Sequence, residues 1–263
     1  MNIEFNTNGY KLYYINNATV TMHIHVYYEK LLNKIIKRIN KIPINYDLYI
    51  STTSKEKKEF IENYIEKSEK TTANKYEIKI YENKGRDVYP FIRQMRNHYK
   101  EYKYMCHLHT KRSAHKLYLG SNWSEYLYKN LIGNKRLIYD ILYDFEQNEK
   151  LGFIFPESYY ELIKGILEYN NLNMRLNDKN KKFINFILNK IFHKYKVGDK
   201  LIFPIGNMFW AKTKAIYQIF NVRLKFPDEL GQTDKTIMHA IERIWLYLVK
   251  LNGYYYKIIF KHY

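Results

Sequence analysis

Segments typical of strands alternate with segments typical of helices along the first half of the chain, and this alternation constrains the fold more than any other feature. Four stretches combine β-branched and aromatic residues with an alternating pattern: 18–28, 46–52, 75–83 and 102–109. Three stretches between them carry apolar residues at helical spacing: 29–42, 54–70 and 88–102. Because strands joined by helices pair in parallel, we expect an α/β fold with a mostly parallel sheet flanked by helices.

The second half is less regular, and we expect it to add further helices around the sheet. Helical patterns cover 121–148, 160–196 and 234–252, and extended patterns cover 150–156, the residues around a turn at Gly206, and 254–262. No low-complexity linker or internal repeat divides the chain. We therefore predict one domain over 1–263, with a sheet-bearing half at 18–156 and a helical insertion with closing elements at 157–263.

The composition excludes several classes of protein. A hydrophobic content of 46% with 17% aromatic residues is too high for a disordered chain. No apolar run approaches the roughly 18 to 20 residues that cross a bilayer, and the first residues lack the basic and apolar pattern of a secretion signal. The single Cys106 cannot form an internal disulfide. These features favour a protein of the reducing cytoplasm.

A formal net charge of +18 predicts an anionic partner. Anionic membrane lipid, nucleic acid and phosphorylated substrates would all be attracted by such a charge, although part of it can simply lie on solvated surfaces. The sequence contains no helix-turn-helix, RNP or zinc-finger pattern, so we do not expect nucleic acid to be the partner. A non-catalytic basic binding protein or scaffold stays open as an alternative.

Polar clusters follow the predicted strands. They lie at 25–28, 51–54, 82–87 and 107–113. In open α/β sheets, ligands bind beyond the carboxyl ends of the strands. We therefore expect the four clusters to meet at one edge of the sheet and to form the binding site.

The segment NKGRD at 83–87 is the sharpest of these clusters. Gly85 between charged residues, at a strand-to-helix turn, lets the backbone approach a ligand closely. Arg86 can form paired hydrogen bonds with a phosphate or carboxylate, and Asp87 can accept from sugar or ribose hydroxyls. The alternative is that Gly85 only makes a turn and Asp87 only caps the helix.

The segment HLHTKRS at 107–113 allows three interpretations. His107 and His109 project to the same side of a strand and could bind a metal, which would suit a metal-dependent hydrolase, but no third ligand is evident. Alternatively, they face the phosphates of a nucleotide together with Lys111 and Ser113. The third interpretation is two histidines packed in the core.

Two segments of the second half carry further candidate residues. Asn207 and Trp210 suit sugar recognition, because an indole face stacks on a pyranose ring, although Trp210 could equally be core. Asp234 stands ahead of a helix as a candidate general base or as a helix cap. His239 and Arg243 are four residues apart and share one face of that helix, where they could contact a ligand or form an ion pair.

Taken together, these blocks resemble the rhamnan synthesis protein F family of bacterial polysaccharide glycosyltransferases. The resemblance extends from about Thr21 to Gly253 and is weakest between Tyr160 and Lys200. The matching segments are MHIHVYY, YDLYISTTS, ENKGRDVYPF, YMCHLHTKRS with WSEYL, GNMFWAK and DKTIMHAIER. The resemblance implies a GT-A-like fold and transfer of a sugar, rhamnose from a dTDP-activated donor, to a cell-surface polysaccharide or lipid-linked glycan, by an inverting displacement.

The resemblance also implies a role for each candidate residue. The nucleotide sugar would be held by His25, Tyr27, Thr52, Thr53, Asn83, Gly85, Arg86, Asp87, His107, His109, Lys111 and Ser113. Asp234, with Glu229 as second choice, would be the catalytic base. The sugar or acceptor would be contacted by Asn207, Trp210, His239 and Arg243.

The expected cofactor requirement follows from one departure from the GT-A pattern. Where GT-A enzymes usually carry an Asp-x-Asp metal motif, this chain has His107-Leu108-His109. We expect cationic side chains to replace the metal charge, so that no cofactor is required, with Mg²⁺ or Mn²⁺ binding at His107 and His109 as the open alternative. The net charge and the lipid-linked acceptor suggest peripheral contact with anionic lipid at the inner face of the membrane.

Overall fold

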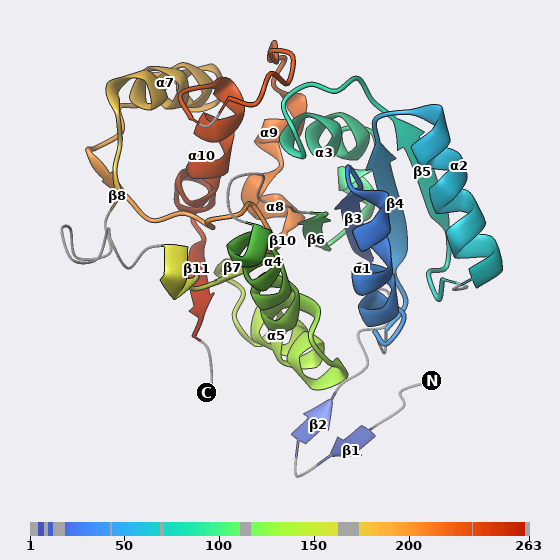
Figure 1. Ribbon diagram of the computed structural model, residues 1–263. Coiled ribbons are helices and arrows are strands. Elements are labelled where there is room, and N and C mark those ends of the chain that lie inside the picture. Colours follow the sequence, from blue (N-terminus) through green and yellow to red (C-terminus); the bar gives the residue numbers. More distant parts are fainter. Residues whose placement is uncertain are drawn as a thin grey trace.

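A seven-stranded sheet runs through the centre of the protein (Figure 1). The structure is a computed structural model that describes residues 5–7, 10–12, 19–42, 44–68, 71–110, 117–162, 174–232 and 234–260. Across the sheet the strands are β11 (Tyr255–Ile259), β7 (Leu151–Pro156), β10 (Phe209–Lys212), β6 (Tyr104–His109), β3 (Val20–His25), β4 (Asp47–Thr52) and β5 (Tyr76–Ile80). Only β10 is antiparallel to its neighbours, β6 and β7. The predicted α/β fold with a mostly parallel sheet is confirmed.

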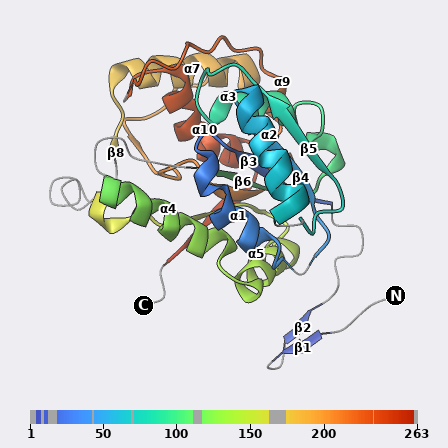
Figure 2. The same cartoon turned by 45° about the vertical axis from the view of Figure 1, so that its right-hand side comes forward.

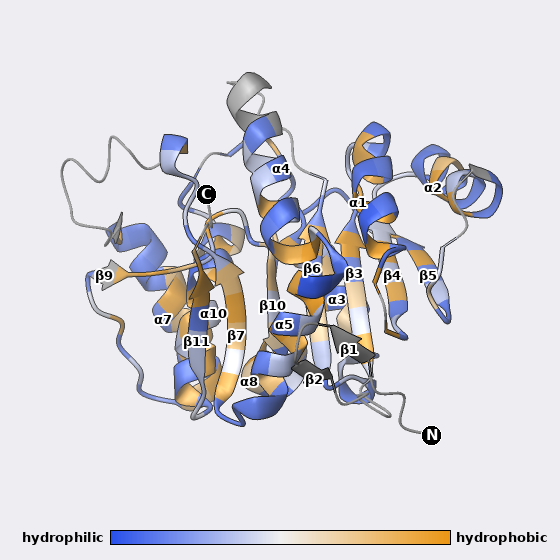
Figure 3. Ribbon diagram, turned by 90° about the horizontal axis from the view of Figure 1, so that it is seen from below, coloured by the Kyte–Doolittle hydropathy of each residue, from blue (hydrophilic) through white to orange (hydrophobic). Residues whose placement is uncertain are grey.

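Helices cover both faces of the sheet. One face packs against α3 (Val88–Met95), α7 (Asp178–Phe192), α8 (Thr213–Ile216), α9 (Gln218–Asn221) and α10 (Ile237–Leu251). The other packs against α1 (Leu32–Ile39), α2 (Lys55–Asn63), α4 (Leu117–Ile132) and α5 (Lys135–Gln147). Figures 1 and 2 show these two layers, and Figure 3 shows apolar strands between helices whose outward surfaces are polar. Two short sheets, β1 (Phe5–Thr7) with β2 (Tyr10–Leu12) and β8 (Met174–Arg175) with β9 (Lys200–Leu201), complete the strands described.

Three of the described helices begin at a capping side chain. Ser54, Asn134 and Asn177 each accept a hydrogen bond from a backbone N–H in the first turn, at the starts of α2, α5 and α7. The predicted helix at 88–102 is shorter than expected. It ends at Met95, and a turn and a short 3₁₀ segment at Tyr99–Glu101 lead into β6.

Alternation along β10 decides which side chains enter which half of the core. Phe209 and Ala211 belong to the cluster around α3 and α10, whereas Trp210 lies in the cluster on the opposite face. β10 inserts between β6 and β7, so all four of its residues are buried. The sequence of a strand that is buried on both faces is a continuous apolar run, so it does not indicate which side chains face the site.

We expect Gly152→Ala to destabilise the protein by about 1–3 kcal/mol, because overpacking of a tight core forces shifts of its neighbours. A Cβ at Gly152 in β7 would lie 2.6 Å from Cβ of Tyr254 and 2.7 Å from Cβ of Ala215. Urea unfolding measures the change. Gly198→Ala is the matched control, because a Cβ there has no heavy atom within 4 Å. Equal stabilities of the two variants would contradict the packing at β7.

Candidate functional site

The carboxyl ends of three parallel strands bring their polar side chains together. His25 of β3 lies in register with Ser51 of β4 on one side and with His109 of β6 on the other. One pleat further back, His23 lies in register with His107. Side chains two residues apart on a strand share a face, so four imidazoles line the face that is covered by α3. The predicted convergence of 25–28, 51–54 and 107–110 is therefore observed.

Asp87 is the only carboxylate among these imidazoles in the part of the chain that the structure describes. It precedes α3, but its side chain makes no capping hydrogen bond. Instead, Oδ2 accepts from Nδ2 of Asn207 at 2.6 Å and from Nε2 of His107 at 3.2 Å. The Asp87 residue is only 5% exposed. The hydrogen bonds of Asp87 thus support a functional role for this carboxylate and not a role as helix cap.

The environment of Asp87 favours its ionised form. Burial alone would raise the pKa of this carboxyl, but the neighbouring His109 and the hydrogen bonds from His107 and Asn207 outweigh burial. The pKa of Asp87 therefore lies well below its ordinary value of 3.8. An ionised carboxylate at the carboxyl edge can accept hydrogen bonds from ligand hydroxyls.

The turn at Gly206 and Asn207 orients the Asp87 carboxylate. Asn207 has a left-handed backbone, with φ of 52°, and follows Gly206 with φ of 101°. Its Oδ1 accepts from Nε1 of Trp245 in α10 at 2.7 Å, which directs Nδ2 toward Asp87. The Gly206 carbonyl accepts from Nε2 of His109 at 2.8 Å. Trp245 was missed in the sequence because an indole on the apolar face of a long helix is typical of core.

The histidines extend the hydrogen-bonded cluster away from Asp87. Nδ1 of His107 lies 3.0 Å from Nδ1 of His23, and Nε2 of His23 lies 3.4 Å from Oγ of Ser51. The same Oγ lies 3.0 Å from Nδ1 of His25. His23 was also missed by sequence reasoning, whereas Ser51 belongs to the predicted polar cluster at 51–54. The signal was available, because MHIH at 22–25 repeats the His-x-His spacing of CHLH at 106–109 on the neighbouring strand.

Burial keeps His23 and His25 neutral. It lowers the pKa of His25 from the ordinary 6.5 to about 3, and it lowers the pKa of His23 well below that ordinary value. The other imidazoles nearby act in the same direction, and Asp87 acts against it.

The Arg86 side chain points toward helix α10 and the loop at 226–232. Its backbone is left-handed, with φ of 53°, and its Nε lies 3.1 Å from Oε2 of Glu229. Nη2 also donates to the carbonyl of Gln232, and Nη1 lies 3.4 Å from Nε2 of His239. Burial, followed by the nearby Arg86, lowers the pKa of His239 to about 4. Arg86 is thus joined to the second-choice base, Glu229, and to a predicted ligand residue, His239.

The turn around Gly85 holds the same loop through its backbone. Gly85 N donates to the carbonyl of Pro227 at 3.3 Å, and Glu229 N donates to the carbonyl of the exposed Asn83 at 3.1 Å. Gly85 has φ of 57°, and a Cβ there would lie 2.5 Å from Cδ1 of Phe226. Gly85 is therefore required both by conformation and by the close approach of Phe226.

The first-choice base, Asp234, joins two helices. It accepts from Nδ2 of Asn177 and of Asn180 at the start of α7, and it pairs with Nη2 of Arg243 in α10 at 3.2 Å. Although burial acts in the opposite direction, the hydrogen bond from Asn180 and the charge of Arg243 contribute to lowering the pKa of Asp234. Arg243 also donates to the carbonyl of His239. Asp234 thus lies beside Arg243 of α10 and forms an ion pair with it, and its side chain does not cap that helix.

Four predicted contact residues need correction because they have no exposed surface: Asn207, Trp210, His107 and Thr52. Asn207 orients Asp87 and does not contact a sugar directly. Trp210 lies in the core on the opposite face, where its Nε1 donates to the carbonyl of Leu131 at 2.9 Å, so it cannot stack on a sugar. His107 packs against Phe91 with ring centroids 4.1 Å apart and cannot contact a diphosphate directly. Thr52 donates to the carbonyl of Val26 and cannot contact a nucleotide either.

A half-buried cationic group borders the site beyond β3 and β4. Nζ of Lys57 lies 3.9 Å from the ring centre of Tyr27, donates to the Tyr27 carbonyl at 2.7 Å and lies 3.3 Å from Oγ1 of Thr53. Lys57 was not singled out in the sequence, because a lysine in a lysine-rich helix start looks like a solvated residue. Lys111 and Ser113 lie outside the described residues.

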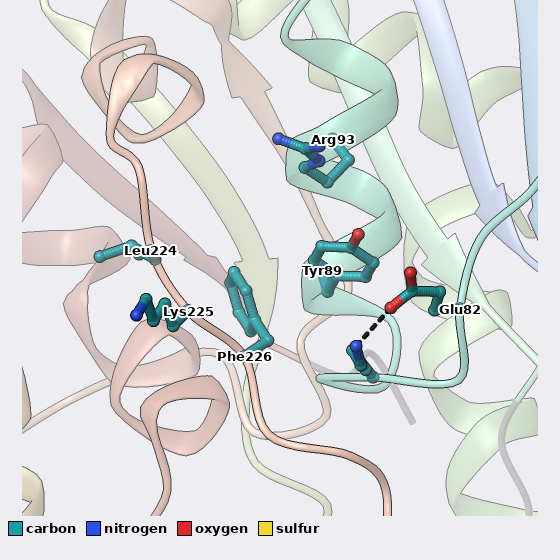
Figure 4. Close-up of a pocket in the computed structure, with 7 residues that line it drawn as sticks. Glu82, Tyr89, Arg93, Leu224, Lys225 and Phe226 are labelled. Carbon is teal, nitrogen blue, oxygen red and sulfur yellow. Dashed lines mark ion pairs between the residues drawn. The ribbon is translucent and has the colours of Figure 1, made fainter.

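A hollow of about 380 Å³ lies beside the Gly85 turn (Figure 4). The rings of Tyr89 and Phe226 face each other there with centroids 5.2 Å apart, and the close-up shows Arg93 one turn further along α3. The full lining consists of Glu82, Lys84, Tyr89, Arg93, Leu224, Lys225 and Phe226. Its cations and aromatic rings suit an anionic ligand that carries an apolar or ring-shaped part.

The described residues include neither a cluster of metal ligands nor a helix that could span a membrane. No three His, Cys, Asp or Glu side chains within those ranges are placed to hold a metal ion together. No helix there combines the length and the apolar character that crossing a membrane requires.

The chain is similar in sequence to one described protein family and to proteins of Xanthomonas campestris. The family described as Rhamnan synthesis protein F matches residues 6–254. Protein WxcX of Xanthomonas campestris pv. campestris, strain B100, is 27% identical over 176 residues. The alignment covers 64% of this chain and 23% of that relative, so the chain spans about a quarter of its length. WxcX of a second strain of the same pathovar matches with the same identity and coverage.

We expect the free energy of unfolding to fall as the pH is lowered from about 6 to about 4. In that window the unfolded chain binds a proton at His25, whose ordinary pKa is 6.5, whereas the folded protein does so only at about 3. The unfolded state therefore binds more protons, and acid favours it. His25→Gln should reduce the slope by about 1.4 kcal/mol per pH unit. Urea unfolding at several pH values measures it, with the exposed His193→Gln as control. Parallel curves for native protein and His25→Gln would contradict the buried, neutral state of His25.

Proposed function

The chain belongs to the rhamnan synthesis protein F family, and on that premise we propose that it is a glycosyltransferase. In this proposal it moves a sugar from a nucleotide-activated donor to a cell-surface polysaccharide or lipid-linked glycan. The donor that the family suggests is rhamnose activated by dTDP. The family as such is implicated in polysaccharide synthesis, and the proposal assigns this chain the transfer step.

One observation carries the proposal: an ionised, buried carboxylate stands at the carboxyl edge of a parallel sheet. Asp87 is oriented by Asn207 and His107, and its Oδ1 makes no hydrogen bond to a described residue. Such an oxygen can accept from the hydroxyl of a ribose or a transferred sugar. The carboxyl edge is also the position at which α/β sheets bind nucleotides.

The surrounding residues suit the two ends of a nucleotide sugar. Tyr27 and Thr53, with Lys57 between them, offer a ring, a hydroxyl and a cation for the nucleotide. His109 is only 7% exposed, and Lys111 follows it in the sequence. In the proposal these two groups neutralise the leaving diphosphate, where the largest negative charge develops. His107 contributes indirectly, through its hydrogen bond to Asp87.

The chemical step in this proposal is a single displacement. An acceptor hydroxyl oxygen attacks C1 of the sugar, the bond from C1 to the diphosphate oxygen breaks with its electron pair, and the configuration at C1 inverts. A base must take the hydroxyl proton. Asp234 and Glu229 are paired with Arg243 and Arg86 respectively. Although burial acts against it, the hydrogen bond from Asn180 and the charge of Arg243 contribute to lowering the pKa of Asp234, which makes Asp234 a weaker base than a solvated carboxylate.

The proposal includes no required metal ion. The charge that a divalent cation would supply to the diphosphate comes instead from protein cations. Among the described residues, Lys57 and His109 lie at this edge, and the net charge of +18 raises the local concentration of anionic ligands.

We expect a nucleoside diphosphate, dTDP first, to stabilise the protein by about 2.7 kcal/mol at a hundredfold its dissociation constant. Thermal unfolding with a panel of nucleotides and nucleotide sugars measures this, in EDTA and with added Mg²⁺ or Mn²⁺. A shift that persists in EDTA supports binding through protein cations. A shift that requires the metal would place an ion at the diphosphate, and no shift with any nucleotide would remove the support for a nucleotide-sugar donor.

Asp87→Asn should weaken binding of the nucleotide sugar by 1.5–3 kcal/mol, roughly the contribution of a hydrogen bond to a charged group. Calorimetric titration of the folded variant measures the loss. Asp140→Asn is the matched control, because that carboxylate is exposed on α5. If folded Asp87→Asn binds the donor as tightly as the native protein does, Asp87 does not contact it.

The lipid-linked acceptor predicts contact with a membrane surface. We expect the protein to co-sediment with vesicles that contain anionic lipid at low ionic strength, and to be released by salt at roughly 0.5 M, because salt screens exposed charges. Neutral vesicles of the same size are the control. Failure to bind anionic vesicles at low salt would contradict the peripheral membrane contact.

A further inference from the structure

The buried imidazoles form a continuous chain that the displacement step described above does not use. From Asp87 the contacts run to His107 at 3.2 Å, to His23 at 3.0 Å, to Ser51 at 3.4 Å and to His25 at 3.0 Å. None of these side chains is more than slightly exposed. Both ends lie at the carboxyl edge, because His25 is the last residue of β3 and Asp87 precedes α3. Oδ1 of Asp87 and Nε2 of His25 make no hydrogen bond to a described residue.

Along these hydrogen-bonded side chains, the donor or acceptor role of each group depends on the role of its neighbour. Because ionised Asp87 only accepts, Nε2 of His107 must donate to it. If His107 is neutral, its Nδ1 accepts from Nδ1–H of His23, and Nε2 of His23 then accepts from the Ser51 hydroxyl. Ser51 in turn accepts from Nδ1–H of His25. Every donor then points toward Asp87, and Nε2 of His25 carries a lone pair.

One added proton reverses the donor and acceptor roles between His107 and His25, while Nε2 of His107 still donates to Asp87. If His107 carries protons on both nitrogens, its Nδ1 donates to His23. His23 then donates through Nε2 to Ser51, Ser51 donates to Nδ1 of His25, and His25 keeps its proton on Nε2. The two arrangements differ by a single proton, which is taken up at His25 and appears at His107. No side chain has to move between them.

We propose that His25, Ser51, His23 and His107 form a proton relay that accepts the proton of the acceptor hydroxyl at Nε2 of His25 and stores it at His107 beside Asp87. This inference rests on the proposed glycosyl transfer. His25 would be the catalytic base, and Ser51, His23 and His107 would act through it.

The step balances in atoms and electrons. The acceptor O–H bond breaks as Nε2–H of His25 forms, while the acceptor oxygen bonds to C1 and the diphosphate leaves with its electron pair. Nδ1–H of His25 passes to Ser51, the Ser51 proton passes to Nε2 of His23, and Nδ1–H of His23 passes to Nδ1 of His107. After product release, the reverse transfer returns the proton to solvent.

The electrostatic surroundings favour transfer in the inward direction. Burial most strongly disfavours a positive charge on His25, and His109 and His107 from β6 and Lys57 from α2 also disfavour it, while Asp87, which precedes α3, favours it. Because burial also disfavours charge on His25 and His23, the proton does not remain on either of them. At His107 the proton forms an ion pair with Asp87, at 3.2 Å. The relay thus connects a base that stays neutral with a buried anion that stabilises the transferred charge.

Nitrogen NMR of the histidine side chains tests the relay without any turnover. At about pH 8 we expect protons on Nδ1 of His23, Nδ1 of His25 and Nε2 of His107, since neutral imidazoles carry one proton each. In the arrangement in which His107 carries protons on both nitrogens, both His23 and His25 should be in the Nε2–H form. If they keep their tautomers while His107 gains its proton, the relay is overturned.

Ser51→Ala interrupts the relay at its longest contact without changing either end. In this variant His25 should no longer change tautomer with His107, while His23 still does. The turnover number should fall by about 100-fold or more, as for loss of general base catalysis, with the dissociation constant of the donor unchanged. Thr213→Ala is the matched control, because Oγ1 of Thr213 is a buried hydroxyl with no hydrogen-bond partner among the described residues.

The outcomes separate this inference from the proposed function. Donor turnover in the native protein that Ser51→Ala leaves intact would overturn the relay and keep the transferase. Absence of turnover with every donor would contradict the transferase, while the tautomer titration would still decide whether the four side chains transfer a proton together. A loss of turnover with an equal loss of donor binding would indicate a merely structural role for Ser51 and would also overturn the relay.

Discussion

The buried carboxylate of Asp87 is the constraint around which the rest of the site is arranged. An isolated ionised carboxylate in a protein interior is strongly unfavourable unless hydrogen bonds and charges compensate for lost water. Here the compensation comes from distant parts of the chain: His107 on β6 and Asn207 from a turn between β9 and β10. Removing one partner of a buried charge typically costs about 3–5 kcal/mol. The charge of Asp87 therefore fixes the relative positions of α3, β6 and the 206–207 turn.

Two turns with left-handed backbone meet at the Asp87 carboxylate, and together they fix its position. Gly85 and Arg86 direct the chain into α3, while Gly206 and Asn207 bring an amide to Asp87 from the other side. Left-handed backbone is unfavourable for Arg86 and Asn207, and such strain persists only where the surroundings over-determine it. Arg86 is held by Glu229, and Asn207 by Trp245. The same contacts that stabilise the turns therefore orient the groups of the site.

Sequence reasoning located most of the site but misjudged how deep its members lie. Asp87, His25, His109 and Asn207 were predicted from strand ends and a glycine turn, and the structure brings them together. His23 and Trp245 were not predicted, Ser51 was predicted only as part of the cluster at 51–54, and Trp210, predicted as a sugar contact with core as the alternative, is core. The reason is that β3, β6 and β10 are buried on both faces. Along such strands, polarity and alternation do not reveal which face carries the chemistry.

The fold class and the edge of the sheet that carries the site follow from the residues alone, because local periodicity specifies strands and helices and their order imposes parallel pairing. The position of each hydrogen bond does not follow. Whether Asp87 caps a helix or accepts from Asn207, and whether Arg86 meets a ligand or Glu229, depends on residues more than a hundred positions away. Only the packing of α10 and the 226–232 loop against the sheet brings those partners into contact, since long-range pairing is set by tertiary structure rather than by local sequence.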